Sequence, residues 1–220
     1  MKKQSSRYAV LTADIAGSRA IADFPSERDK KLRPLSKLHR TGELIASDYA
    51  VTAWDEFEGL LTALAHIPQV LLDLRRYFHP FQLRVAIGIG DVSNPAQKPV
   101  NVFAGGSAFE RARKAITQLN AERTTLARST LFLSESSEFD TIMNTLYQLH
   151  DTLAERISAK QWEAINLQLK AKSQDATARR LGLDKSSISR RLRRGYYWQL
   201  VNTREAAKTI IAHYWKQHSP

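Results

Sequence analysis

Cysteine is absent from this sequence of 220 residues, which excludes a disulfide framework and any metal site built on thiolates. Long hydrophobic runs are also lacking, since no stretch reaches the roughly 18 uninterrupted apolar residues that a membrane-spanning helix needs. The first residues are positively charged, but no apolar region with a small-residue cleavage site follows them before Asp14. We therefore expect a cytoplasmic protein without a membrane partner.

Several motifs of well-known chemistry are missing as well. The chain has neither a GxxxxGK[ST] phosphate-binding loop nor a GxSxG nucleophile elbow. Its six histidines form no metal-binding pair at i and i+4 with acidic neighbours. Gly88-Ile89-Gly90 ends a predicted strand, but it does not open a helix at the spacing that dinucleotide binding requires. None of these signatures therefore predicts an active site.

Negative charge is scarce in the last third of the chain. Residues 155–220 hold 14 Lys and Arg against 5 Asp and Glu, a net charge of +9. Residues 1–154 hold 19 against 17, a net charge of only +2. This asymmetry predicts two modules, one nearly neutral and one that binds a polyanion.

The hydrophobic pattern of residues 1–135 alternates strands and helices, which predicts an α+β domain. Tyr8–Ala13 is expected to be a buried strand, residues 26–47 a surface helix, and the runs around Asp55-Glu56 a hairpin with an acidic tip. Further elements are expected at Ile67–Tyr77 (helix), Phe81–Ile89 (strand), Ser107–Leu119 (helix) and Leu126–Leu133 (strand).

From residue 136 onward the predicted pattern is entirely helical. We expect residues 136–156 to form a connector helix and residues 157–220 an all-α domain. Its helices are expected at Ala159–Lys170, Gln174–Leu181, Lys185–Arg194 and Thr203–Gln217. The last of these could close the core of the C-terminal domain, or it could supply a dimer contact.

The segment SQDATARRLGLDKSSISRRLRR, residues 173–194, carries the pattern of a helix-turn-helix. Ser173 and Asp184 are each suited to cap a helix, and Gly182 can adopt the left-handed conformation of a sharp turn. Ile188 and Leu192 are four residues apart and are expected to face inward. The segment resembles the helix-turn-helix of sigma-factor region 4, and residues 157–169 are similar to the helix that precedes it there.

The opposite side of the second helix presents side chains that suit base edges and phosphates. These DNA-binding candidates are Lys185, Ser186, Ser189, Arg190, Arg193 and Arg194, with Arg179 and Arg180 on the preceding helix expected to contact the DNA backbone. One alternative is a solvated basic face on a small helical subdomain. Another is an adaptor whose helical tail docks on an acidic protein surface.

A carboxylate also ends the first predicted strand, in YAVLTADIAGS at residues 8–18. Asp14 and Asp55, on neighbouring strand ends, could share Mg²⁺ or Mn²⁺. The loop of Ile15, Ala16, Gly17 and Ser18 would then bind a nucleotide, with its backbone N–H groups around the phosphates. The alternative is that both aspartates are strand-end carboxylates, held by local N–H groups and otherwise silent.

Four motifs occur in the order found in class III nucleotidyl cyclases and GGDEF domains, and the module resembles the SatD-like family still more. The motifs are TADIAGS, WDEFEGLL, LRVAIGIGDV and GGSAFERARKA. The resemblance implies a ferredoxin-like βαββαβ core that forms a homodimer, followed by a C-terminal helix-turn-helix domain.

Two departures from the cyclase pattern argue against catalysis, and no catalytic residue is assigned. Trp54 stands where cyclases place a glycine and could fill the pocket, while Glu110 stands in place of an asparagine that stabilises the transition state. A carboxylate there would repel the developing phosphate charge.

We therefore expect a regulator that binds double-stranded DNA and senses a nucleotide or metal. The alternative is a nucleotidyl cyclase or nucleotide-processing enzyme with a nucleic-acid-binding tail.

Overall fold

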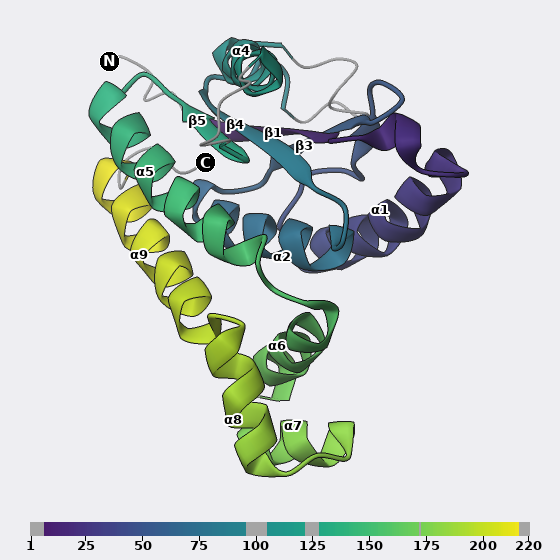
Figure 1. Ribbon diagram of the computed structural model, residues 1–220. Coiled ribbons are helices and arrows are strands. Elements are labelled where there is room, and N and C mark those ends of the chain that lie inside the picture. The colour runs from purple at the N-terminus through teal and green to yellow at the C-terminus, as the bar shows by residue number, and fades with distance from the viewer. Residues whose placement is uncertain (1–6, 96–104, 122–127, 172, 216–220) are drawn as a thin grey trace.

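The computed structural model describes residues 7–95, 105–121, 128–171 and 173–215 (Figure 1). In these ranges the chain is an α+β protein with one five-stranded mixed sheet and eight α-helices. The elements are β1 (Tyr8–Ile15), α1 (Phe24–Thr41), β2 (Ala50–Val51), β3 (Glu56–Leu61), α2 (Ile67–Phe78), β4 (Leu83–Gly90), α4 (Ser107–Ala121), β5 (Thr130–Leu133), α5 (Ser137–Ala154), α6 (Ala159–Ala171), α7 (Gln174–Leu181), α8 (Lys185–Arg194) and α9 (Tyr197–Trp215).

The sheet has the strand order β2-β3-β1-β4-β5. β1 lies at its centre and pairs antiparallel with both β3 and β4, whereas β5 pairs parallel with β4. The register sets Asp14 opposite Glu56 on one side and opposite Arg84 on the other. Three charged residues therefore lie side by side at the end of the central strand.

Helices cover both faces of the sheet, with α4 on one face and α1, α2 and α5 on the other (Figure 1). The larger core lies on the second face, where the rings of Phe57 and Phe78 stack with centroids 5.3 Å apart. On the first face, Gly88 lets α4 approach the backbone of β4. A Cβ atom at Gly88 would lie 2.1 Å from the carbonyl oxygen of Ala108.

α5, the helix expected to connect two modules, packs against β5 and is part of the larger core. The ring of Phe139 on α5 lies 6.3 Å from that of Phe132 on β5. α9 runs alongside α5 in Figure 1, and the ring of Trp215 lies 5.6 Å from that of Phe139. The end of α9 is thus buried with the sheet, a contact that neither of the two alternatives for the last predicted helix included.

α6, α7 and α8 form a small bundle that protrudes below the sheet in Figure 1. Its core combines Trp162 and Ile165 of α6 with Ile188 and Leu192 of α8, and Leu200 at the start of α9 closes it. α9 therefore contacts both cores. The domain boundaries at residues 135 and 156 stay a prediction.

The bounds of α7 and α8 match the sequence prediction to the residue. The predicted first strand extends two residues further, to Ile15. Of the strand expected at Leu126–Leu133, the structure shows Thr130–Leu133, and residues 126–127 lie outside its described ranges.

Candidate nucleic-acid interface and carboxylate site

Local hydrogen bonds fix the turn between α7 and α8. The side chain of Ser173 caps α7 by accepting a bond from the amide of Ala176 at 3.4 Å. Gly182 has φ +62°, and the amide of Leu183 donates to the carbonyl of Ala178 at 3.0 Å. Because a left-handed glycine with this bond ends a helix sharply, only three residues separate α7 from α8.

A carboxylate caps the second of these helices. Oδ1 of Asp184 accepts a bond from the amide of Ser187 at 2.7 Å, and the hydroxyls of Ser186 and Ser187 also donate to the carboxylate. These bonds hold the pKa of Asp184 well below its usual range. The N-terminus of α8 is therefore fixed by a group that stays ionised at neutral pH.

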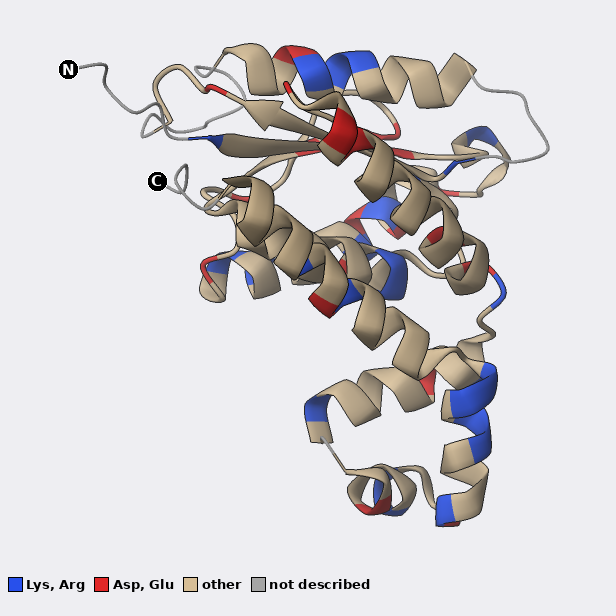
Figure 2. Cartoon of the chain, turned by 90° about the vertical axis from the view of Figure 1, so that its left-hand side faces the viewer, with Lys and Arg blue, Asp and Glu red and all other residues tan. Residues whose placement is uncertain are grey.

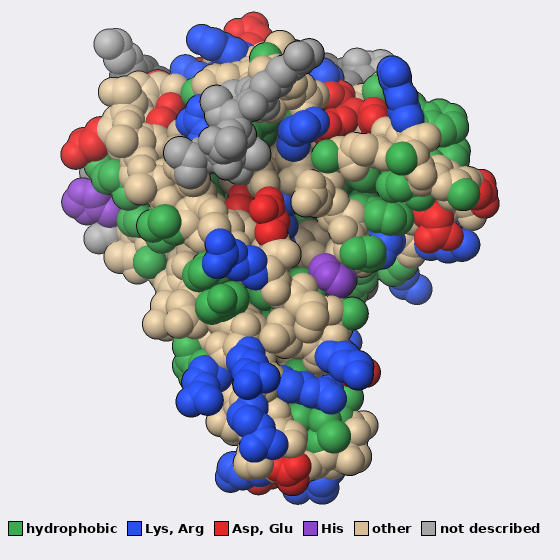
Figure 3. Space-filling view, viewed as in Figure 1, with side chains coloured by type: hydrophobic (Ala, Val, Ile, Leu, Met, Phe, Trp, Pro, Cys, Tyr) green, Lys and Arg blue, Asp and Glu red, His purple; other side chains and the backbone are tan. Residues whose placement is uncertain are grey.

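α8 divides into a buried and an exposed face. Ile188 and Leu192 are fully buried against α6. All eight predicted DNA-binding residues are exposed: Arg179, Arg180, Lys185, Ser186, Ser189, Arg190, Arg193 and Arg194. Figure 2 shows the Lys and Arg positions gathered along the protruding bundle, and Figure 3 shows their side chains covering the lower part of the molecule.

Two cations missed by the sequence prediction lie beside this face. A hollow of about 300 Å³ between the start of α6 and α8 is lined by Lys160 and Arg191, together with Arg190 and Arg194. Arg191 lies 3.8 Å from the carboxylate of Glu163 on α6. The sequence related α6 only to the helix that precedes a helix-turn-helix, so nothing in it indicated that Lys160 would lie next to α8.

The second candidate site is at the end of the central strand, where Asp14 and Asp55 come together. Arg84 reaches Oδ2 of Asp14 at 3.3 Å, and the hydroxyl of Ser18 donates to Oδ2 of Asp55 at 2.5 Å. Burial raises the pKa of Asp14, the nearby charge of Asp55 raises it further, and Arg84 partly opposes both effects. Asp14 is thus a partly desolvated carboxylate that the charge of Asp55 repels.

The loop predicted to cradle phosphates is partly engaged within the protein. The amide of Ile15 donates to the carbonyl of Asp55 at 3.0 Å, and the amide of Ala16 donates to the carbonyl of Gln82 at 2.9 Å. Gly17 has φ +71°, and Ser18 follows it in a single turn of 3-10 helix. Two of the four backbone N–H groups are therefore used in holding strand ends together.

The sequence prediction overlooked two glutamates that face α4 from the neighbouring strand. Glu56 forms an ion pair with Arg113 of α4 at 2.7 Å. Glu58 is buried, accepts a bond from the hydroxyl of Thr12 at 3.2 Å, and has a pKa raised by that burial. Their alternation in WDEFEGLL is the signal that could have placed both on one face.

Two further features limit what this site can bind. Trp54 is 57% exposed and lies beside the ring of Phe24, at 5.8 Å, so it does not fill a pocket as the sequence suggested. Within the described part of the chain, no group of three or more His, Cys, Asp or Glu side chains is arranged to hold a metal ion. A metal ion here would be coordinated by only two carboxylates from the protein, and oxygens of a ligand or of water would have to complete its coordination shell.

In the described ranges no helix has the length and apolar character needed to cross a bilayer.

Comparisons with known proteins identify one family. A solved structure similar to this chain is the regulator of polyketide synthase expression from Bifidobacterium adolescentis, 13% identical over 96% of this chain and 82% of that one, with a TM-score of 0.25. A likeness this low carries no argument, and no curated protein matches. The SatD family model, however, matches residues 8–211, so the chain belongs to the SatD family.

Proposed function

We propose that this protein is a transcriptional regulator that binds double-stranded DNA through α7 and α8 as a helix-turn-helix. The observation that carries the proposal is the division of α8 into a buried apolar face and an exposed face of serines and arginines. No carboxylate interrupts the sequence from Lys185 to Arg194. A short, capped, basic helix on a protruding bundle is the element that such domains place in the major groove.

The exposed residues divide by the part of DNA that each suits. Ser186, Ser189 and Arg190 lie in the first two turns of α8, the part of a recognition helix that reads base edges. The remaining cations suit phosphates, which fix the position of the protein on the duplex. They are Lys185, Arg193 and Arg194 on α8, Arg179 and Arg180 on α7, and the flanking Lys160 and Arg191.

Salt-dependent binding of a fluorescent 30-base-pair duplex tests this proposal by anisotropy. Removing Arg190 and Arg194 together (Arg190→Ala with Arg194→Ala) is expected to weaken binding at least about tenfold, because two charged contacts to DNA are lost. The matched control is Lys30→Ala with Arg33→Ala on α1, which removes the same charge from side chains that are 65% and 82% exposed. Unchanged affinity in the α8 variant would overturn the proposal and favour the adaptor alternative.

The first module supplies the rest of the proposed regulator. Its order β2-β3-β1-β4, in a β1-α1-β2-β3-α2-β4 sequence of elements, supports a ferredoxin-like, cyclase-like domain with β5 added at one edge. We propose that this domain forms a homodimer, which would present two copies of α8 to half-sites one helical turn of DNA apart, roughly 34 Å. The dimer predicts an operator with two-fold symmetry.

Sensing is proposed to reside at Asp14 and Asp55. A divalent cation, Mg²⁺ or Mn²⁺, would relieve the repulsion between these two carboxylates, and it would bring the phosphates of a nucleotide with it. The amides of Gly17 and Ser18 would bind those phosphates, since Ile15 and Ala16 already donate within the protein. Arg84 and Arg113 lie at the same edge and would balance the added negative charge.

Calorimetric titration with nucleoside triphosphates and Mg²⁺ tests the sensing site. Heat is expected for wild type only when metal and nucleotide are both present, and it should be lost in Asp14→Asn. Asp48→Asn, at a side chain that is 56% exposed, is the control for loss of one negative charge. Heat that survives in Asp14→Asn would place the ligand elsewhere, and no heat with any nucleotide would leave Asp14 as a structural carboxylate.

A further inference from the structure

A hollow of about 360 Å³ lies where the sheet meets the C-terminal bundle. Leu38 at the end of α1, Arg76 and Tyr77 on α2, Leu169 and Lys170 on α6, and Arg204 on α9 contribute to its walls. Its size is within the range of small-molecule sites. The hollow is thus bounded by elements of both parts of the protein.

Positive charge exceeds negative charge in this hollow. Arg76, Lys170 and Arg204 face a single carboxylate, Asp73. Both oxygens of Asp73 are already engaged, Oδ1 by Arg76 at 2.5 Å and Oδ2 by the side chain of Gln69 at 2.8 Å. His39 also lies 3.3 Å from Oδ2. Among the described residues, Asp73 is therefore bonded to groups of α1 and α2 and not to Lys170 or Arg204.

Neither of the other two cations has a carboxylate partner among the residues that line the hollow. Arg204 donates to the amide oxygen of Gln69 at 3.1 Å and pairs with its exposed neighbour Glu205 at 2.9 Å. Within the described part of the chain, no carboxylate pairs with Lys170. Two cations at the mouth of an apolar-walled hollow attract an anion, since the surrounding protein screens charge less than water does.

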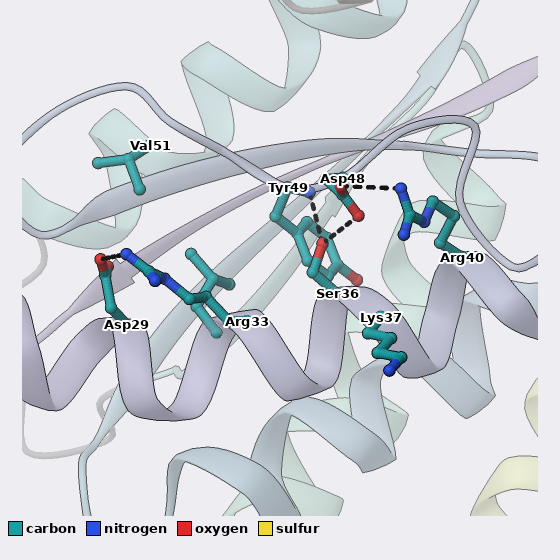
Figure 4. A pocket seen from close by; sticks show the side chains of 9 residues that line it. Asp29, Arg33, Ser36, Lys37, Arg40, Asp48, Tyr49 and Val51 are labelled. Carbon is teal, nitrogen blue, oxygen red and sulfur yellow. Dashed lines mark hydrogen bonds and ion pairs between the residues drawn. The ribbon is translucent and has the colours of Figure 1, made fainter.

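The hollow beside β2, shown in Figure 4, is a useful contrast. It is of similar size, about 350 Å³, and also contains arginines. There, however, Arg33 pairs with Asp29 at 3.1 Å and Arg40 pairs with Asp48 at 3.2 Å, as the dashed lines show. That hollow therefore sets two carboxylates against its three cations, Arg33, Lys37 and Arg40, so its excess of positive charge is smaller.

We propose that the hollow between the sheet and the bundle binds a small organic anion, a carboxylate or a phosphate monoester with an apolar body. The head group would lie on Lys170 and Arg204, and the body would pack against Leu38, Leu44 and Leu169. Such a ligand contacts α1 on one side and α6 and α9 on the other. It would therefore stabilise one position of the bundle that carries α8.

A hydrogen-bonded series of side chains already joins these parts. The hydroxyl of Tyr49 lies 2.7 Å from Nδ1 of His39, whose other ring nitrogen faces Asp73. The guanidinium of Arg76 donates to Asp73, and its Nε also donates to the side chain of Asn166 on α6 at 2.6 Å. A ligand next to Arg76 would thus act on the direct polar contact between α2 and α6.

Calorimetric titration of the full chain, without DNA or nucleotide, tests the site with hexyl phosphate, hexanoate, hexanol and inorganic phosphate as probes. We expect hexyl phosphate or hexanoate to bind and hexanol to bind at least about tenfold more weakly, because the charged head group supplies the directional contacts. Binding of hexanol equal to that of both anions, or no binding of either anion, would overturn the proposal. Inorganic phosphate binding as tightly as hexyl phosphate would overturn the assigned role of the apolar walls.

Variants locate the site. Lys170→Gln with Arg204→Gln is expected to weaken anion binding at least about tenfold, whereas Lys30→Gln with Arg33→Gln on the far side of α1 should leave it unchanged. Equal melting curves of both variants and wild type by circular dichroism establish that folding is intact, and the conservative Arg204→Lys variant should retain binding. Unchanged affinity in Lys170→Gln with Arg204→Gln would contradict the proposal, whatever the outcome of the DNA measurements.

Discussion

Asp14 ends a buried strand with one counter-charge, Arg84, 3.3 Å away and a second carboxylate, Asp55, close by. An ionised group in these surroundings is costly to the fold, because burial and like charge both disfavour it. Groups held in such a state are concentrated at functional sites. The pH dependence of stability therefore reports on this residue directly.

Neutralising this carboxylate is expected to stabilise the protein. The pKa of Asp14 is raised in the folded state, so its contribution to stability is fully present below the unfolded value, 3.8, and is lost as pH rises. Asp14→Asn should accordingly have a higher free energy of unfolding than wild type at pH 7, with the difference shrinking toward pH 3. Urea unfolding at both pH values measures it, and a difference that does not change with pH would contradict the account.

Gly88 is expected to be irreplaceable for a steric reason. A Cβ atom there would meet the carbonyl oxygen of Ala108 at 2.1 Å and the amide nitrogen of Ala112 at 2.4 Å, both of them backbone atoms of α4. Gly88→Ala should lower the free energy of unfolding by about 3 kcal/mol. Gly105→Ala, where nothing lies within 4 Å, is the matched control and should change it by less than about 0.5 kcal/mol. Similar urea midpoints for the two variants would refute the close approach of α4.

At the scale of elements, α2, α5 and β5 are joined by one buried ion pair. Arg75 of α2 lies 3.0 Å from Asp151 of α5, and the hydroxyl of Thr130 on β5 donates to the same carboxylate at 2.6 Å. Burial disfavours the charge of Asp151, but Arg75, His150 and the hydroxyl of Thr130 together outweigh it and lower the pKa of the carboxyl. The pair therefore holds α5 on the sheet.

Breaking this pair is expected to cost far more than breaking a surface pair. Asp151→Ala should lower the free energy of unfolding by about 3–5 kcal/mol, because Arg75 is left buried without its partner. Since the folded pKa of Asp151 is lowered, wild type should lose this contribution as pH falls below 3.8. Asp175→Ala removes an exposed pair with Lys185 and should cost less than about 1 kcal/mol. Equal losses in urea unfolding at pH 7 would contradict the assignment.

The elements also show what a sequence can and cannot reveal. The ends of α7 and α8 follow from Ser173, Gly182 and Asp184, because caps and turns depend on local residues. The surface against which α9 packs does not follow from local residues. An amphipathic pattern shows that Ile211 and Trp215 are buried, but it does not show against which helix or strand. The contact of α9 with α5 was therefore not predictable, whereas the α+β class was.

The candidate sites, too, were predictable only where local residue patterns determine them. The exposed face of α8 was predictable because helical periodicity places Ser189 and Arg190 opposite Ile188 and Leu192. Asp14 and Asp55 were also predicted to meet, from strand ends in sequence. The use of the Ala16 amide by Gln82 depends on strand register and loop path, which no local pattern encodes.

At the scale of the whole molecule, the bundle that carries α8 is joined to the sheet by few polar contacts. Arg76 donates to Asn166 of α6 at 2.6 Å, and Arg204 of α9 donates to Gln69 of α2 at 3.1 Å. α9 adds apolar contacts to both cores. Leu72 of α2 also lies in the core of the bundle, and the ring of His79 lies 6.5 Å from that of Trp162 on α6, so these contacts connect the first module to α8 as well.

Removing the contact to α6 is expected to loosen the bundle. Asn166→Ala leaves the Nε of Arg76 without this partner and should lower the free energy of unfolding by about 1.5–3 kcal/mol, as for other bonds to charged groups. Amide hydrogen exchange in α6 should become faster than in β1. Exposed Asn202→Ala on α9 is the control, expected within about 0.5 kcal/mol of wild type. Unchanged exchange in α6 would contradict a role of this bond in fixing the bundle.

The central claim, that the basic bundle binds DNA, is tested most directly by the slope of log affinity against log salt concentration. Each phosphate contact contributes about 0.9 to the magnitude of that slope. Arg193→Ala with Arg194→Ala should therefore reduce the magnitude by about 2, while Lys30→Ala with Arg33→Ala leaves it unchanged. A wild-type affinity that shows no salt dependence, or a slope that is the same in all three proteins, would contradict the account.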